Sequence, residues 1–164
     1  MAAIVYLSET NGPTGAPVVT NNLSNCNFGS FDAPNLVPGA HPIIVGENSF
    51  TKYWRVRVFD LDTSSIVKDF RFWKSAGNYL SGESIIWSSS GFSYATPTAA
   101  PVSGVNIDVA NPGSENIFIG GGSGGEITVA PNYSDYFRVQ LRSTLSTPAI
   151  DAEEKTFFFQ YDET

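Results

Sequence analysis

Apolar and polar residues alternate along several stretches of this chain, and a period of two predicts β-strands rather than helices. The stretches are residues 50–60, 66–73, 135–142 and 155–162. On one face of these strands lie the apolar residues Trp54, Val56, Val58, Ile66, Phe70, Phe72, Phe137, Val139, Leu141, Phe157, Phe159 and Tyr161. We predict that these side chains form the core.

Shorter apolar stretches at 43–45, 84–87, 105–109, 117–119 and 126–130 also predict strands. Turn residues separate them, and no stretch shows a sustained helical period. Eight or nine short strands of this kind are typical of an antiparallel β-sandwich, Ig-like or jelly-roll-like. The loop 60–65 is expected to close a hairpin, and residues 88–101 are expected to form a surface excursion.

The first 25 residues look unable to fold alone. An apolar run at 3–7 is followed by turn formers at 11–17 and a polar tract at 20–22. Fixing about 25 residues costs on the order of 25–50 kcal/mol of backbone entropy, and each buried apolar side chain returns only about 1.5–3 kcal/mol.

We therefore expect an extended N-terminal arm at 1–25 before a sandwich domain at 26–164. The arm would be ordered by backbone pairing with a sheet edge outside this domain, on another subunit. Its inter-subunit contact residues would be Ile4, Val5, Tyr6, Leu7, Val18 and Val19. Deleting residues 1–22 should then leave the domain folded.

Composition limits the classes of partner. Hydrophobic residues make up 41% of the chain, but charged residues only 15%, against about 25% in an ordinary globular protein. A net charge of −7 argues against binding to nucleic acid phosphates. Six of the nine basic residues lie between Lys52 and Lys74. That segment faces either an acidic partner or solvent.

Targeting signals and disulfides are not expected. The single cysteine, Cys26, excludes an internal disulfide, and its alternation with Phe28 suggests a small buried group. No signal peptide is apparent, and no apolar run approaches the roughly 20 residues of a membrane helix. We expect synthesis in a bacterial cytoplasm.

The residues offer little for catalysis, so we expect no enzyme and no cofactor or metal. The only histidine, His41, lies in a loop, and no Gly-x-Ser-x-Gly elbow is present. Asp60, Asp62 and Asp69 could ligate calcium, but a calcium loop needs more acids at a stricter spacing, and a turn capped by an aspartate explains the first two better. The glycine-rich run 120–125 is flanked by strands, which predicts a hairpin tip rather than a phosphate loop.

Two tryptophans remain open to two interpretations. Trp73 and Trp87 end predicted strands. They either close the edge of the core or form a platform on which a sugar ring stacks. The second interpretation predicts a carbohydrate-binding module.

Several short motifs follow one another along the chain: NFGSFDAPNLVP at 27–38, GENS at 46–49, FWKSAG at 72–77, YSDY at 133–136 and FQYDE at 159–163. Their order resembles a set of small, mostly uncharacterised structural proteins of tailed bacteriophages and prophages. The resemblance spans about residues 25–164 and implies a virion protein. It brings no catalytic residues with it.

These observations lead to one expectation of function and two alternatives. The chain is expected to be a virion structural protein, and specifically an auxiliary capsid protein that decorates or cements the head. Its partners would be the major capsid protein or tail proteins and copies of itself, with no nucleic acid or membrane. The alternatives are a tail, neck or baseplate component and a host-surface carbohydrate-binding module.

Overall fold

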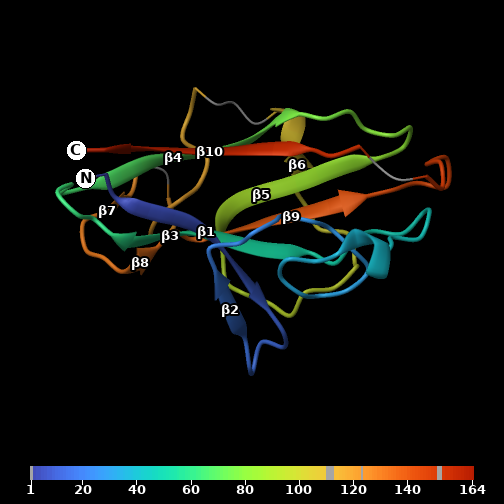
Figure 1. Ribbon diagram of the computed structural model, residues 1–164, viewed down its shortest axis with the longest axis horizontal. Helices are drawn as coiled ribbons and strands as arrows, with labels where there is room; N and C mark the ends of the chain where they lie inside the picture. Colours follow the sequence, from blue (N-terminus) through green and yellow to red (C-terminus); the bar gives the residue numbers. More distant parts are fainter. Residues whose placement is uncertain (1, 110–112, 123, 151–152) are drawn as a thin grey trace.

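The computed structural model describes residues 2–109, 113–122, 124–150 and 153–164 as strands, two short 3-10 helices and loops (Figure 1). In chain order the elements are β1 (Ile4–Asn11), β2 (Val18–Asn21), η1 (Pro38–Ala40), β3 (Lys52–Asp60), β4 (Val67–Ala76), β5 (Ser84–Phe92), β6 (Val105–Asn106), η2 (Ile107–Val109), β7 (Glu126–Ile127), β8 (Asn132–Tyr133), β9 (Tyr136–Arg142) and β10 (Thr156–Glu163).

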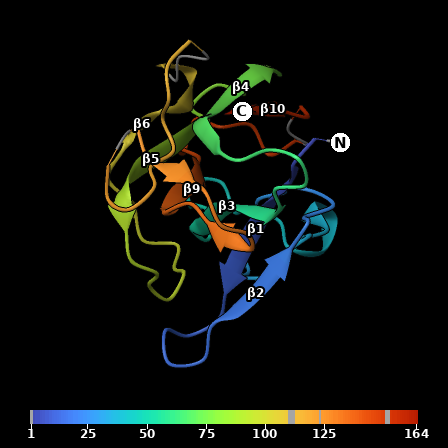
Figure 2. The ribbon, with the colours of Figure 1, turned by 90° about the vertical axis from the view of Figure 1, so that its left-hand side faces the viewer.

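The strands form two antiparallel sheets that face each other, which confirms the predicted all-β sandwich. The larger sheet has seven strands in the order β2-β1-β3-β9-β5-β6, with β8 also paired to β3. The smaller sheet has the order β10-β4-β7. Figures 1 and 2 show β4 and β10 lying above the layer that contains β1, β3 and β9.

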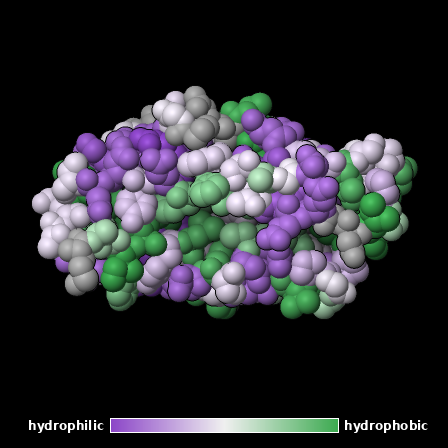
Figure 3. All heavy atoms as spheres, turned by 45° about the horizontal axis from the view of Figure 1, so that its top comes forward, coloured by the Kyte–Doolittle hydropathy of each residue, from purple (hydrophilic) through white to green (hydrophobic). Residues whose placement is uncertain are grey.

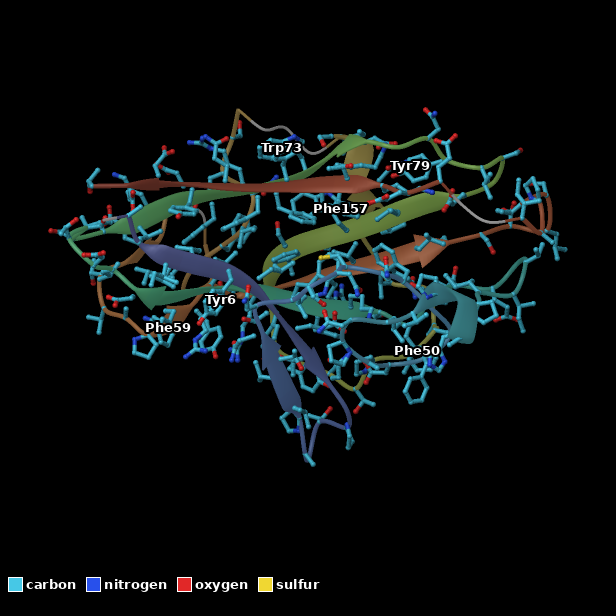
Figure 4. All side chains as sticks on the ribbon, in the orientation of Figure 1. Tyr6, Phe50, Phe59, Trp73, Tyr79 and Phe157 are labelled. Atoms are coloured by element: carbon cyan, nitrogen blue, oxygen red, sulfur yellow. The ribbon has the colours of Figure 1, made fainter. Side chains whose placement is uncertain are left out.

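Aromatic side chains fill the space between the sheets, as the alternation predicted. Trp54 of β3 is fully buried, and its ring centroid lies 6.0 Å from that of Phe72 and 6.1 Å from that of Phe137. Phe157 of β10 stacks on Phe72 at 5.5 Å, and Figure 4 shows it pointing into the gap between the layers. Burying each such side chain contributes roughly 1.5–3 kcal/mol, so this cluster holds the two sheets together.

The segment expected to be an arm is instead part of the domain. β1 lies inside the seven-stranded sheet, between β2 and β3, and pairs with β3 through seven residue pairs, from Ile4–Asp60 to Thr10–Tyr53. Its last four residues are buried although all of them are polar. Contacts within the domain therefore order β1, and residues 1–25 and 26–164 do not form separate units.

The end of β1 and the strand β2 form a hairpin that projects from the two sheets. Figures 1 and 2 both show the β1–β2 hairpin extending away from the two sheets. Among the described strands, β2 pairs with β1 alone and ends the strand order of the larger sheet. Val18 and Val19 are 63% and 36% exposed at this edge. Of the predicted arm residues, Val18 is the most exposed, followed by Ile4 of β1 at 46% and then Val19.

The loop between β3 and β4 does not close a hairpin, because the two strands belong to different sheets. It crosses from one layer to the other. Within it, the backbone N–H of Asp62 donates to the Asp60 carboxylate at 2.9 Å, which is the aspartate-capped turn that the sequence suggested. In β4, Asp69 has a φ of +54° and interrupts the alternation between Val67 and Phe70.

Four other local predictions also change. Residues 43–45 and 117–119 form no regular strand, and 105–109 gives two strand residues followed by η2. The alternation at 135–142 places Gln140 on the polar side, opposite Phe137 and Val139, but the structure buries it fully. The segment after β5 covers it: its amide donates to Ala100 O at 3.0 Å and accepts from Val102 N at 3.1 Å.

Candidate functional site

The outer face of the seven-stranded sheet carries a group of arginine and aromatic side chains. Alternation in β3 places Arg55, Arg57 and Phe59 on the side opposite the core, and the register sets Tyr6 and Tyr133 on either side of Arg57. Figure 4 shows Tyr6 and Phe59 on the side away from β4 and β10. We call this surface the arginine–tyrosine face; it consists of Tyr6, Arg55, Arg57, Phe59, Tyr133 and Tyr136.

Aromatic rings hold both guanidinium groups in place. Arg55 Cζ lies 3.7 Å from the ring centroid of Tyr133 and 4.7 Å from that of Tyr136. Arg57 Cζ lies 5.1 Å from the Phe59 centroid and 5.5 Å from the Tyr133 centroid. Such cation–π contacts contribute about 0.5–2 kcal/mol each and restrict the side chains. Tyr133 contacts both arginines and links them into one surface.

Both arginines of this face have a side-chain N–H group that donates no hydrogen bond within the described residues. Within the described residues, Nε of Arg55 and Nε of Arg57 are buried without a hydrogen-bond partner. None of the ion pairs in the described part of the chain involves either residue. By contrast, Arg71 on the smaller sheet pairs with Asp162 at 2.9 Å.

Tyrosines connect this face to the root of the hairpin. The hydroxyls of Tyr136 and Thr10 lie 3.0 Å apart, and the Tyr94 ring centroid is 5.9 Å from that of Tyr136. The Tyr94 hydroxyl donates to Gly12 O at the start of the hairpin turn. Burial, followed by the charge of Asp32, raises the pKa of Tyr94 to about 12, so this hydroxyl stays protonated at neutral pH.

A buried polar network fixes β1 on the core side of the sheet. The Lys52 ammonium lies 2.8 Å from Glu9 Oε1, and both side chains are 1% exposed. Glu9 Oε2 accepts from Trp54 Nε1 at 2.8 Å, and Glu9 Oε1 accepts from Asn11 Nδ2 at 2.7 Å. Asp32 accepts from Asn11 and from the backbone of the turn, at 2.6 and 2.7 Å. The network therefore ties β1 to β3 and to the loop that carries Asp32.

Cys26 lies close enough to this network for the charges of Glu9 and Lys52 to change the pKa of its thiol. Burial is the main cause that raises the pKa of its thiol, with the Glu9 carboxylate adding to the effect and Lys52 opposing it. The resulting value is about 11, against an ordinary 9.0. A thiol that stays protonated is a poor nucleophile, which agrees with a structural role for Cys26.

We expect iodoacetamide to alkylate Cys26 at pH 8 at least about 100-fold more slowly in the native protein than in urea, because the raised pKa lowers the thiolate fraction by that factor. The folded state retains this proton longer than the unfolded chain. Its contribution to stability is therefore complete below pH 9 and is lost as the pH rises through 11. Mass spectrometry of timed samples measures both rates; equal rates would contradict the burial of this thiol.

The two tryptophans singled out in the sequence lie in different environments. Trp87 is 6% exposed and belongs to the core, next to a shallow hollow of about 210 Å³ lined also by Gly104, Val105 and Phe118. Its ring is not displayed for stacking. Within the described residues its Nε1 is buried without a hydrogen-bond partner.

Trp73 points away from the core on the outer face of the smaller sheet, as Figure 4 shows. It stacks on Phe158 of β10 with ring centroids 5.7 Å apart and an interplanar angle of 19°. Phe158 is 51% exposed. In the space-filling view of Figure 3, which brings this side forward, hydrophobic patches lie among hydrophilic residues. Trp73 and Phe158 are therefore a second candidate binding surface.

The glycine-rich run binds carboxylates of its own chain. The backbone N–H groups of Gly120 and Gly121 donate to Asp135 at 3.2 and 2.6 Å, and that of Gly124 donates to Glu115. Ile119 and Gly122 form an isolated bridge, but 117–119 is no regular strand and β7 pairs with β4, so the predicted hairpin between flanking strands does not form. Because internal carboxylates occupy these donors, the loop is not set up to hold a phosphate.

Other titratable residues occupy structural positions. His41 stacks on Phe31 at 5.0 Å in a loop. Tyr79, labelled in Figure 4, contacts the ammonium groups of Lys74 and Lys155 at 4.5 and 5.6 Å. Burial, with Asp108 next, raises the pKa of its hydroxyl. In the part of the chain that the structure describes, no three His, Cys, Asp or Glu side chains are placed to hold a metal ion.

Comparison with known proteins returned no relatives. No protein-family model matches this chain, and searches of curated proteins and of solved structures gave no significant match. Over the described residues no helix is long and apolar enough to span a membrane. The geometry of the surface therefore carries the functional argument.

The sequence placed Arg55 and Arg57 on a common face but did not identify that face as a candidate site. The concentration of basic residues between Lys52 and Lys74 was the available signal. Tyr133 and Tyr136, which complete the face, come from β8 and β9. Only the pairing of those strands with β3 shows that they contact the arginines.

Proposed function

We propose that this chain is a non-enzymatic structural component of a bacteriophage particle, and specifically an auxiliary capsid protein that decorates or cements the head. The arginine–tyrosine face is the observation that carries the binding role. Tyrosine and arginine are enriched among residues that dominate binding energy at protein interfaces. The motif resemblance described above supports the assignment to a phage particle.

The mechanism would be repeated weak association on a symmetric lattice. A stable interface buries about 1,200–2,000 Å² in total, and repetition over many equivalent positions raises the overall affinity. The face and the projecting hairpin lie next to each other because Tyr136 contacts Thr10. One partner surface can therefore engage both.

The hairpin adds a second mode of contact. Since β2 ends the sheet order, its outer edge can accept a strand from a neighbouring protein. We expect the double substitution Val18→Lys and Val19→Lys to lower incorporation into particles at least about tenfold, with little effect on folding because both side chains are exposed. Quantitative mass spectrometry of purified particles measures the copy number.

The matched control is Val129→Lys, a loop valine that is 67% exposed. It should leave incorporation unchanged. Gold labelling of the wild-type chain then separates head from tail, neck or baseplate. Labels on the head support the auxiliary capsid role, labels elsewhere support the tail, neck or baseplate alternative, and a particle without the chain contradicts the proposal.

The stacked pair Trp73 and Phe158 favours one second candidate, a carbohydrate-binding module. Two adjacent rings on a sheet face resemble a platform for the apolar face of a sugar. A glycan array comparing the wild type with Trp73→Ala tests this function. Binding that Trp73→Ala abolishes would support it, and no binding by the wild type would remove it.

A further inference from the structure

We propose that the arginine–tyrosine face binds an extended acidic segment of a partner protein, with the guanidinium groups of Arg55 and Arg57 each receiving one carboxylate. This inference names the partner chemistry for the binding role proposed above and rests on it. It concerns a specific arrangement of donors rather than a general positive charge.

The donors are arranged for carboxylates. A guanidinium carbon 3.7 Å from a ring centroid, as in Arg55 and Tyr133, lies against the face of the ring. The N–H groups of arginine lie in the plane of the guanidinium, so this contact leaves them available at its edge. They match the two oxygens of a carboxylate, and stacking reduces the entropy lost on binding.

Unsatisfied donors supply the driving force. In the part of the chain described, the buried Nε atoms of Arg55 and Arg57 lack acceptors. A buried donor without a partner is destabilising, so a carboxylate that reaches this donor as the side chain adjusts on binding is favoured. The Nε of Arg71 also lacks a partner, so the contrast lies in the terminal nitrogens: an Nη2 of Arg71 and of Arg142 donates to an oxygen of the same chain, Asp162 and Val102 respectively.

The strand sets the spacing. Arg55 and Arg57 are two residues apart on the same face of β3, a separation of about 6.6 Å along the strand. Carboxylates at alternate positions of an extended peptide have the same spacing. Phe59, which is 46% exposed and stacked on Tyr6 at 6.1 Å, continues the face with an apolar surface. The ligand is therefore an extended segment that carries an acidic residue at every second position.

The net charge of the chain favours a protein rather than a nucleic acid as the partner that supplies the acidic groups. With a net charge of −7, the molecule as a whole repels a polyanion such as DNA or RNA. A short acidic segment feels mainly the two local arginines, because salt screens the rest beyond about 8–10 Å. Tyrosine-rich surroundings also fit a protein partner.

The test is an NMR titration of the Arg Nε–Hε signals with eight-residue peptides. A peptide of alternating Glu and Thr should shift the signals of Arg55 and Arg57 but not of Arg71. A peptide with the same composition in Glu-Glu-Thr-Thr order should bind at least about threefold more weakly, since its carboxylates do not match the spacing. A peptide of alternating Gln and Thr should cause no shift.

Substitutions complete the experiment. The double variant Arg55→Gln and Arg57→Gln should weaken binding of the alternating Glu-Thr peptide at least about tenfold, while Arg71→Gln stays within about twofold. Equal affinity for both Glu peptides, unchanged affinity in the double variant, or tighter binding of oligothymidylate or oligogalacturonate would overturn the inference. Because the titration uses the isolated protein, its outcome is independent of whether the chain enters particles.

Discussion

Deleting residues 1–22 should abolish the cooperative fold. The deletion removes β1 and with it seven residue pairs to β3. It also removes Glu9, the partner of Lys52 and of Trp54 Nε1. Leaving the buried Lys52 charge unpaired costs about 3–5 kcal/mol, and exposing the core side of β3 adds to this, against a total stability of about 5–15 kcal/mol.

Urea unfolding followed by circular dichroism, together with the dispersion of amide NMR signals, measures this effect. The control replaces the exposed turn residues Pro13, Thr14, Gly15 and Ala16 with Gly and Ser at the same length. The control should remain folded, because it leaves β1 and its network in place. A folded, cooperative Δ1–22 protein would show that β1 is dispensable and would restore the interpretation of residues 1–25 as a separate arm.

Lys52→Met should lower the free energy of unfolding by about 3–5 kcal/mol, because it leaves the Glu9 carboxylate buried without its counter-charge. The pair is 1% exposed on both sides, so water cannot compensate. Adding Glu9→Gln in the same protein should recover part of the loss, since it removes the unpaired charge. Urea midpoints of the single and double variants measure both effects.

Lys68→Met is the matched control for this substitution. Lys68 and Glu126 lie 3.8 Å apart with side chains 35% and 42% exposed. Breaking an exposed pair of this kind costs at most about 1 kcal/mol. Similar losses for Lys52→Met and Lys68→Met would show that burial of the Glu9 pair does not determine its importance.

The strands in which apolar and polar residues alternate could be predicted from the sequence. The alternation in β3, β9 and β10 gave the correct inward residues, including the buried Trp54 and Phe137 and the partly buried Phe157. A strand with one buried face must show this period, so the signal is direct. The sandwich class followed from the number and spacing of such strands.

The role of β1 could not be predicted in this way, because polar residues fill its buried half. Glu9 is acceptable there only because Lys52, 43 positions later, and Trp54 reach its carboxylate. Local sequence does not reveal pairing over such a separation. The same limit applies to the crossover between β3 and β4, since the turn at Asp60 looks the same whether a hairpin or a change of sheet follows.

The sequence predicted the positions of the two arginines of the candidate site but not the tyrosines that contact them. Alternation placed Arg55 and Arg57 on one face, but a solvated face and a binding face have the same pattern of residues. The contacts with Tyr133 and Tyr136, and the donors left without acceptors, favour a binding face. These are properties of strand pairing and burial that only the folded chain displays.

The most direct test of the proposed role is a cryo-EM reconstruction, at side-chain resolution, of the particle assembled from the genome that encodes this chain. We predict density for the chain on the head, with Arg55 and Arg57 against carboxylates of a neighbouring protein and β2 at the contact. A particle that lacks the chain, or one in which the arginine–tyrosine face is open to solvent, would contradict the proposal.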